Sequence, residues 1–155
     1  MNTITQEEFQ YILPLACEWA EAQEQFIINK GIALTNPQIE DARRVGVTHP
    51  KNIRLLRVLK IPMPDHPALE AAAQATQLIS SHTTGLTLRY GIFIRSDCWG
   101  ERRLTVHELV HTSQYEKLGG FFPFLQKYLM ECITIGYPDA PMEQEAIKIA
   151  DKICT

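Results

Sequence analysis

Two histidines and a glutamate within one short stretch are the residues of this 155-residue chain best suited to chemistry. They form the pattern H-E-x-x-H at His107, Glu108 and His111. On an α-helix, residues four apart lie one turn apart on one face, so both imidazoles can reach one metal ion. A metal lowers the pKa of a bound water molecule, and the intervening carboxylate can take its proton during attack on a substrate. The pattern therefore predicts a hydrolytic metal centre with Glu108 as general base.

A third metal ligand must come from another part of the chain. The metzincin continuation of the motif is excluded, because Gln114 and Lys117 occupy its glycine and histidine positions. A cysteine ligand, as in peptide deformylase, would be Cys98 or Cys132, but neither lies in the Gly-Cys motif of that family. The remaining arrangement, a glutamate on a later helix, points to Glu143.

Residues that could support the ligands lie on the motif helix and on the later helix. Gln114 comes one turn after His111 and is predicted to orient a ligand, with a solvated side chain as the alternative. Asp151 lies two turns after Glu143 on the same face and is predicted to accept a hydrogen bond from a ligand histidine. For Asp151 the alternative is a solvated charge, and for Glu143 it is an acid favoured by the helix dipole.

This combination of motifs resembles that of a known family. The sequence H-E-L-V-H-T-S-Q-Y-E-K-L-G at His107–Gly119, followed by E-Q-E-A at Glu143–Ala146, resembles the gluzincin zinc metallopeptidases, small bacterial members in particular. The resemblance covers about residues 85–151. The chain departs from thermolysin in having no large upstream domain, and in having Met142 where thermolysin has asparagine before the ligand glutamate.

The resemblance implies a zinc ion as cofactor. His107, His111 and Glu143 would hold Zn²⁺ and leave one position open for water, with Glu145 as the reserve for the third ligand. Peptides or proteins would be the substrates.

The expected reaction assigns roles to further residues. Glu108 would act as general base and then as proton donor to the leaving amine. Tyr137, in the turn before the ligand helix, is our candidate for stabilising the negative charge on the carbonyl oxygen, with Tyr115 and Tyr128 as alternatives.

The elements that must position these residues predict a single α+β domain over residues 1–155, mostly helical, with a small sheet packed next to the motif helix. Residues 1–84 would form a helical wall or lid, and residues 85–155 the strand, the motif helix and the ligand helix. Residues 85–95 predict a strand or hairpin, bent at Gly91, against which an extended substrate could pair. Caps and apolar periodicity predict helices over residues 5–30, 36–46, 68–79, 101–118, 121–135 and 141–154, and a strand over 53–60.

Composition excludes several classes of protein. The formal charge is −3, with 15 basic and 18 acidic residues and no basic block, which argues against a nucleic-acid partner. No apolar run is long enough for a bilayer, so no membrane partner is expected. The N-terminus lacks the pattern of a secretory signal, which predicts a cytoplasmic protein whose four cysteines are free thiols.

The function predicted from the sequence is therefore zinc-dependent peptide hydrolysis. Two alternatives remain open at this point. One is a catalytically inactive module that binds zinc or peptides, and the other is a regulatory protease specific for one intracellular protein.

Overall fold

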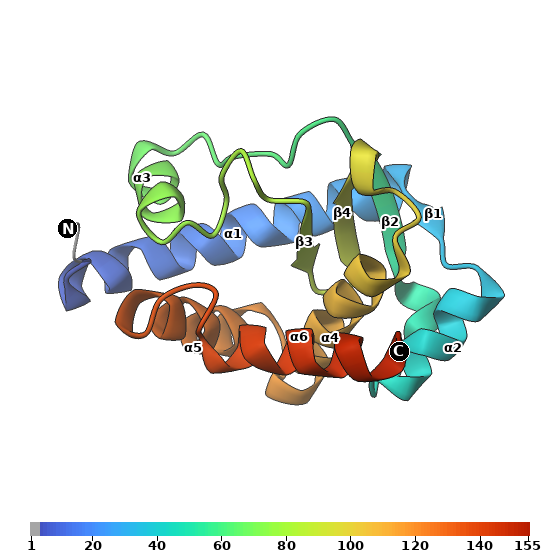
Figure 1. The fold of residues 1–155 in the computed structure, drawn as a ribbon. Coiled ribbons are helices and arrows are strands. Elements are labelled where there is room, and N and C mark those ends of the chain that lie inside the picture. Colours follow the sequence, from blue (N-terminus) through green and yellow to red (C-terminus); the bar gives the residue numbers. More distant parts are fainter. Residues whose placement is uncertain (1–3) are drawn as a thin grey trace.

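One mixed sheet of four strands lies at the centre of the computed structural model, which describes residues 4–155 (Figure 1). The strands are ordered β1-β2-β4-β3, so the hairpin strand β3 lies at an edge. The central strands β2 and β4 are parallel, whereas β1 pairs with β2 and β3 pairs with β4 in antiparallel fashion. The strands are β1 (Ile32–Ala33), β2 (Arg54–Val58), β3 (Gly85–Leu88) and β4 (Gly91–Arg95).

Helices cover both faces of this sheet. The long helix α1 crosses behind the strands, while α4 and α6 lie side by side in front of them (Figure 1). Within residues 4–155 the helices are α1 (Gln6–Lys30), α2 (Asn36–Arg44), α3 (Pro67–Ala75), α4 (Arg102–Leu118), α5 (Phe121–Thr134) and α6 (Pro141–Ile153). The predicted fold class, a mostly helical α+β single domain with a small sheet, is confirmed.

Strand β4 separates two hydrophobic clusters. Successive side chains of a strand point to opposite faces. Phe93 accordingly packs with α1 and α5, whereas Ile92 and Ile94 pack with α2, α4 and α6. All three side chains are almost fully buried, which anchors the sheet between the helix layers.

Local capping signals explain why most helix boundaries agree with the sequence. Thr5 and Glu8 form a reciprocal capping box at the start of α1, and Thr35 forms another with Gln38 at the start of α2. Gly119 ends α4 in the left-handed conformation with φ 101°, where a side chain would be strained. These contacts join residues close in sequence, so they can be read without the tertiary structure.

The structure corrects two predicted elements and adds a strand. Helix α3 ends at Ala75, four residues before the predicted end, and the hydroxyl of the next residue, Thr76, donates to the carbonyl of Ala72. The hairpin turns at Arg89 and Tyr90 before Gly91, which is the first residue of β4 and not a bend within a strand. The two-residue strand β1 was not predicted, because so short a segment carries no periodicity.

The halves of the chain share the sheet. Strands β1 and β2 come from the first 84 residues and continue the sheet through β4. The first half is therefore more than a helical wall, since it supplies part of the support for the second half. No helix in residues 4–155 is long and apolar enough to cross a bilayer.

Candidate metal centre

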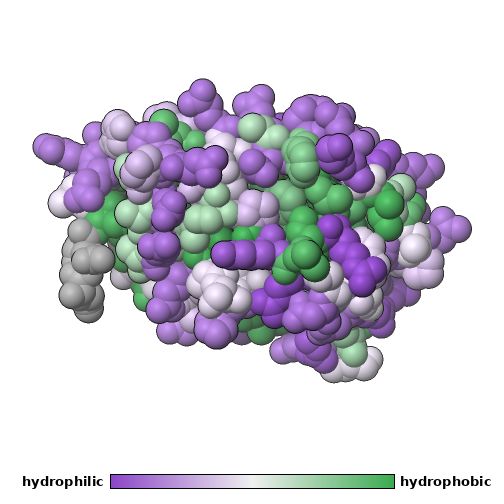
Figure 2. Space-filling model, turned by 90° about the horizontal axis from the view of Figure 1, so that it is seen from above, coloured by the Kyte–Doolittle hydropathy of each residue, from purple (hydrophilic) through white to green (hydrophobic). Residues whose placement is uncertain are grey.

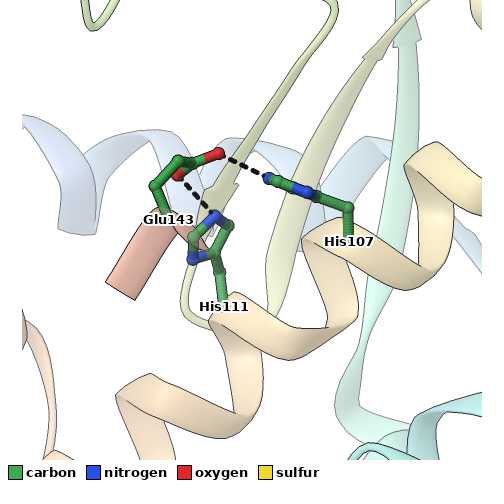
Figure 3. A group of neighbouring side chains, drawn as sticks. All are labelled: His107, His111 and Glu143. Carbon is green, nitrogen blue, oxygen red and sulfur yellow. Dashed lines mark hydrogen bonds and ion pairs between the residues drawn. The ribbon is translucent and has the colours of Figure 1, made fainter. Parts of the chain in front are cut away.

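Three side chains predicted as metal ligands converge between α4 and α6. Nε2 of His107 lies 2.6 Å from Oε1 of Glu143, and Nε2 of His111 lies 3.1 Å from Oε2 of the same carboxylate (Figure 3). One donor atom from each residue lies within 4.8 Å of the others. Two imidazole nitrogens and one carboxylate oxygen form the donor set of a catalytic zinc site. The residues present therefore fit a divalent zinc ion.

Close packing of α6 on α4 brings Glu143 to the histidines. Ala146 and Ala150 follow Glu143 by about one and two turns and are buried in the same cluster as Val106 and Val110 of α4. Small side chains let two helices approach closely, so the start of α6 lies beside the histidine face of α4. Glu143 is only 3% exposed there.

Gln114, which the sequence predicts to orient a metal ligand, contacts His111. Its Oε1 lies 2.8 Å from Nδ1 of His111, and its amide nitrogen donates to the carbonyl of Met142 and to Glu145, each at 3.0 Å. Because the amide nitrogen serves these two acceptors, its oxygen accepts the proton of His111 Nδ1, and Nε2 remains for a metal. The reserve ligand Glu145 accepts from Gln114 and does not belong to the triad.

The Asp151 prediction is wrong in its geometry. Asp151 forms an ion pair with Arg103 and is 55% exposed, so it is a surface charge. Two turns of helix separate it from Glu143 by about 12 Å along the axis, too far to reach the histidines. The ligands are instead supported by Tyr128, whose hydroxyl donates to Oε2 of Glu143 at 2.7 Å.

The sequence predicts for Tyr128 only the role of an alternative hydrogen-bond donor to the substrate. Its ring stacks on Phe124 and meets the ring of His111 edge-on. A tyrosine one turn after an aromatic residue on an apolar helix indicates core packing, and nothing local indicates the bond to Glu143.

Glu108 lies beside the triad and is buried. Its Oε1 accepts a hydrogen bond of 2.7 Å from the hydroxyl of Thr87, and its Oε2 lies 4.0 Å from Nε2 of His107. A Cβ at Gly85 would lie only 3.1 Å from Oε2 of Glu108, so the missing side chain makes room for the carboxylate. Gly85 and Thr87 were not predicted as site residues. The signals that point to them are a polar residue, Thr87, between two leucines and a glycine at the start of the strand.

The three candidate tyrosines differ in what their hydroxyl groups contact. Tyr115 is fully buried and donates to the carbonyl of Thr87 at 3.4 Å, and Tyr128 is held by Glu143. Tyr137 is 37% exposed and lines the same cavity as Glu108 and Glu143. Burial, together with the charges of Glu143 and Glu108, raises the pKa of Tyr137 above its usual value, so the phenol keeps its proton.

The charges in the centre favour an added cation. Burial raises the pKa of Glu143, but the hydrogen bonds from His107 and His111 outweigh it and hold that pKa far below its usual range. Burial likewise lowers the pKa of His111, yet the bond to Glu143 and the nearby carboxylates raise it to about 9. A bound divalent ion would satisfy the same carboxylates in place of imidazole protons.

The cysteine alternative receives no geometric support. Cys98, in the short 3₁₀ helix before α4, and Cys132, buried in α5, are both free thiols. Within residues 4–155, the group of side chains able to hold a metal contains neither of them.

No protein-family model, curated protein or solved structure matches this chain. Function depends on the chemistry of a site rather than on a fold alone. Function is therefore inferred from the triad, from Glu108 and from the cavity that Glu108, His111 and Glu143 line.

Proposed function

We propose that this protein is a zinc-dependent metallopeptidase of the gluzincin type that acts in the cytoplasm. The donor set of His107, His111 and Glu143 supports a single zinc ion. The observation that carries the proposal is the placement of Glu108, a buried carboxylate held beside the triad by Thr87. A site that only stored metal would have no need of an additional, non-ligating carboxylate in this position.

When bound, zinc supplies an electrophile that polarises the peptide carbonyl and makes water more acidic. Glu108 takes a proton from water as the new C–O bond forms, and passes it to the nitrogen as the C–N bond breaks. Tyr137 donates a hydrogen bond to the carbonyl oxygen, on which negative charge develops. Gln114 and Tyr128 hold His111 and Glu143 in place throughout.

The decisive experiment separates metal binding from hydrolysis. Wild-type protein should bind one zinc ion per chain and cleave members of a random peptide library, detected by mass spectrometry. Glu108→Gln should retain zinc and lose about 10²- to 10⁴-fold in activity, because a general base contributes about that factor. Glu40→Gln, on the exposed side of α2, is the matched control and should behave as wild type.

Three outcomes would overturn the proposal. Absence of stoichiometric zinc would remove the metal centre. Stoichiometric zinc without cleavage of peptides or unfolded proteins would instead identify a catalytically inactive binding module. Cleavage that Glu108→Gln leaves unchanged would assign the activity to other residues.

A further inference from the structure

The candidate metal centre faces a cavity of about 100 Å³ whose other lining residues include members of α1, α3, α5 and β3. In Figure 1, α3 lies above α1 and α5 lies below it. The lining of the cavity therefore combines the first half of the chain with the second. Glu108, His111 and Glu143 reach it from α4 and α6.

The charged groups of this cavity belong to the candidate metal centre and to Glu108 beside it. Among residues 4–155 that line it, the charged or titratable groups other than tyrosines are Glu108, His111 and Glu143. The walls supplied by α1, α3 and α5 are apolar, with Leu69 and Leu125 as examples. The exposed surface of the cavity is accordingly mostly apolar. A charged group bound far from the centre would lose its water without gaining a partner.

Small side chains maintain the open space. Ala16 and Ala20 line the cavity from α1, and Ala72 and Ala73 line it from α3. Larger apolar residues at these positions would fill the volume, since protein interiors otherwise pack densely. On the face of the molecule seen in Figure 2, hydrophobic residues are exposed between hydrophilic ones.

We propose that this cavity receives an apolar side chain of the substrate, of leucine or phenylalanine size, from a residue beside the cleaved bond. The inference rests on the proposed peptidase function and adds the class of substrate. A cavity of about 150 Å³ lined by leucine, isoleucine and phenylalanine stays dry and binds benzene. By that measure, the present cavity suits a single branched or aromatic side chain and not a long chain.

Hydroxamates provide a test, because their head group binds zinc while their side chain can be varied. The probes are N-acetyl-leucine, N-acetyl-glycine and N-acetyl-aspartate hydroxamates, titrated calorimetrically into the zinc-loaded protein. The leucine compound should bind about 10- to 100-fold more tightly than the glycine compound, the gain expected from burying one such side chain. The aspartate compound should bind no better than the glycine compound.

Two cavity-filling variants check where the side chain binds. Ala73→Leu on α3 and Ala16→Leu on α1 should each abolish the preference for leucine while keeping zinc and the affinity for the glycine compound. The matched controls are Ala71→Leu and Ala22→Leu, at exposed positions of the same helices, and they should keep the preference. The probe series on the unmodified chain remains decisive if a filled variant does not fold.

A metal-free measurement separates this inference from the proposed function. The chain has two tryptophans, of which Trp19 lines the cavity. In metal-free Trp99→Phe protein, benzene should therefore cause a saturable change in Trp19 fluorescence, and adding Ala73→Leu should remove it.

Each combination of results leads to a conclusion. Zinc-dependent binding of all three hydroxamates at equal affinity would overturn the side-chain assignment and leave the metal centre intact. Benzene binding without any zinc-dependent hydroxamate binding would overturn the peptidase proposal, and the substrate assignment with it. Tighter leucine binding that persists in both filled variants would place the apolar contact elsewhere and overturn the inference.

Discussion

Two buried polar clusters lie on opposite sides of strand β3, and they balance their charges differently. In the first, Glu24 of α1 is 4% exposed and accepts two hydrogen bonds from the guanidinium of Arg89, at 2.7 and 2.8 Å. In the second, the metal centre, Glu143 and Glu108 are equally buried, but their partners are imidazoles and hydroxyl groups. A permanent cation completes the Arg89 cluster, whereas no arginine or lysine within residues 4–155 pairs with Glu108 or Glu143.

The comparison distinguishes a structural cluster from a candidate functional one. The Arg89 cluster joins α1 to the hairpin turn, since Glu24 also accepts from the backbone nitrogen of Tyr90. The hydroxyl of Thr112 on α4 donates to the carbonyl of Arg89 and extends the same connection. All of these bonds tie elements together. In the candidate metal centre, by contrast, Glu108, His111 and Glu143 line a cavity, which favours a ligand rather than a fold contact.

The largest effect is expected on zinc binding, when the carboxylate of the candidate metal centre is removed and that of the Arg89 cluster is not. Glu143→Ala should weaken zinc binding by more than about 100-fold, the upper range for residues that merely support a ligand. Glu24→Ala and the exposed neighbour Glu145→Ala should leave zinc bound, as measured by elemental analysis and competition with a chelator. If Glu145→Ala lost the metal and Glu143→Ala kept it, the ligand assignment would be wrong.

Tyr137→Phe should lower kcat/KM by about 100-fold, the lower range for loss of one hydrogen-bond donor to an oxyanion. Zinc affinity and melting temperature should not change, because the ring and its packing remain. Tyr11→Phe, at a position 57% exposed on α1, is the control and should keep full activity. Equal activity of the two variants would remove Tyr137 from the mechanism.

A substitution in the Arg89 cluster should lower the stability of the protein and leave its zinc affinity unchanged. Glu24→Gln should lower the free energy of unfolding by about 2 kcal/mol, a value reduced because the Arg89 side chain is 38% exposed and can turn to water. Chemical denaturation of the metal-free protein measures the change, with zinc affinity measured alongside. A loss of zinc without a loss of stability would contradict the separation of the two clusters.

Gln114→Leu should weaken zinc binding by about tenfold, because His111 Nδ1 loses the acceptor that orients its ring. The measurement is chelator competition at constant pH. Gln74→Leu, at an exposed position of α3, is the control. Unchanged affinity in Gln114→Leu would show that packing alone orients His111.

The smallest effect is expected at Thr87. Thr87→Val removes the hydroxyl that donates to Glu108 and should lower kcat by about fivefold, consistent with a hydrogen bond worth about 1 kcal/mol. Thr87→Ser retains a hydroxyl and should recover most of the rate, which separates positioning of Glu108 from packing of the strand. Equal rates in all three proteins would mean that Thr87 has no part in positioning.

Sequence patterns recovered the parts of the molecule that depend on neighbours along the chain. The capping box at Thr5, the start of α2 at Thr35, the end of α4 at Gly119 and the placement of His107 and His111 on one helix face are all set within a few residues. The contact between Gln114 and His111 has the same origin, because it spans less than one helical turn. Such features follow from backbone geometry and hydrogen bonding alone.

Packing between distant segments decided the rest. It brought Tyr128 rather than Asp151 to Glu143, placed Gly85 and Thr87 against Glu108, and opened an alanine-walled cavity between α1 and α3. Helix periodicity gives the face on which a residue lies but not its neighbour on another element. That neighbour depends on how closely the helices and the sheet pack, which is why the three ligands could be proposed from the chain and their surroundings could not.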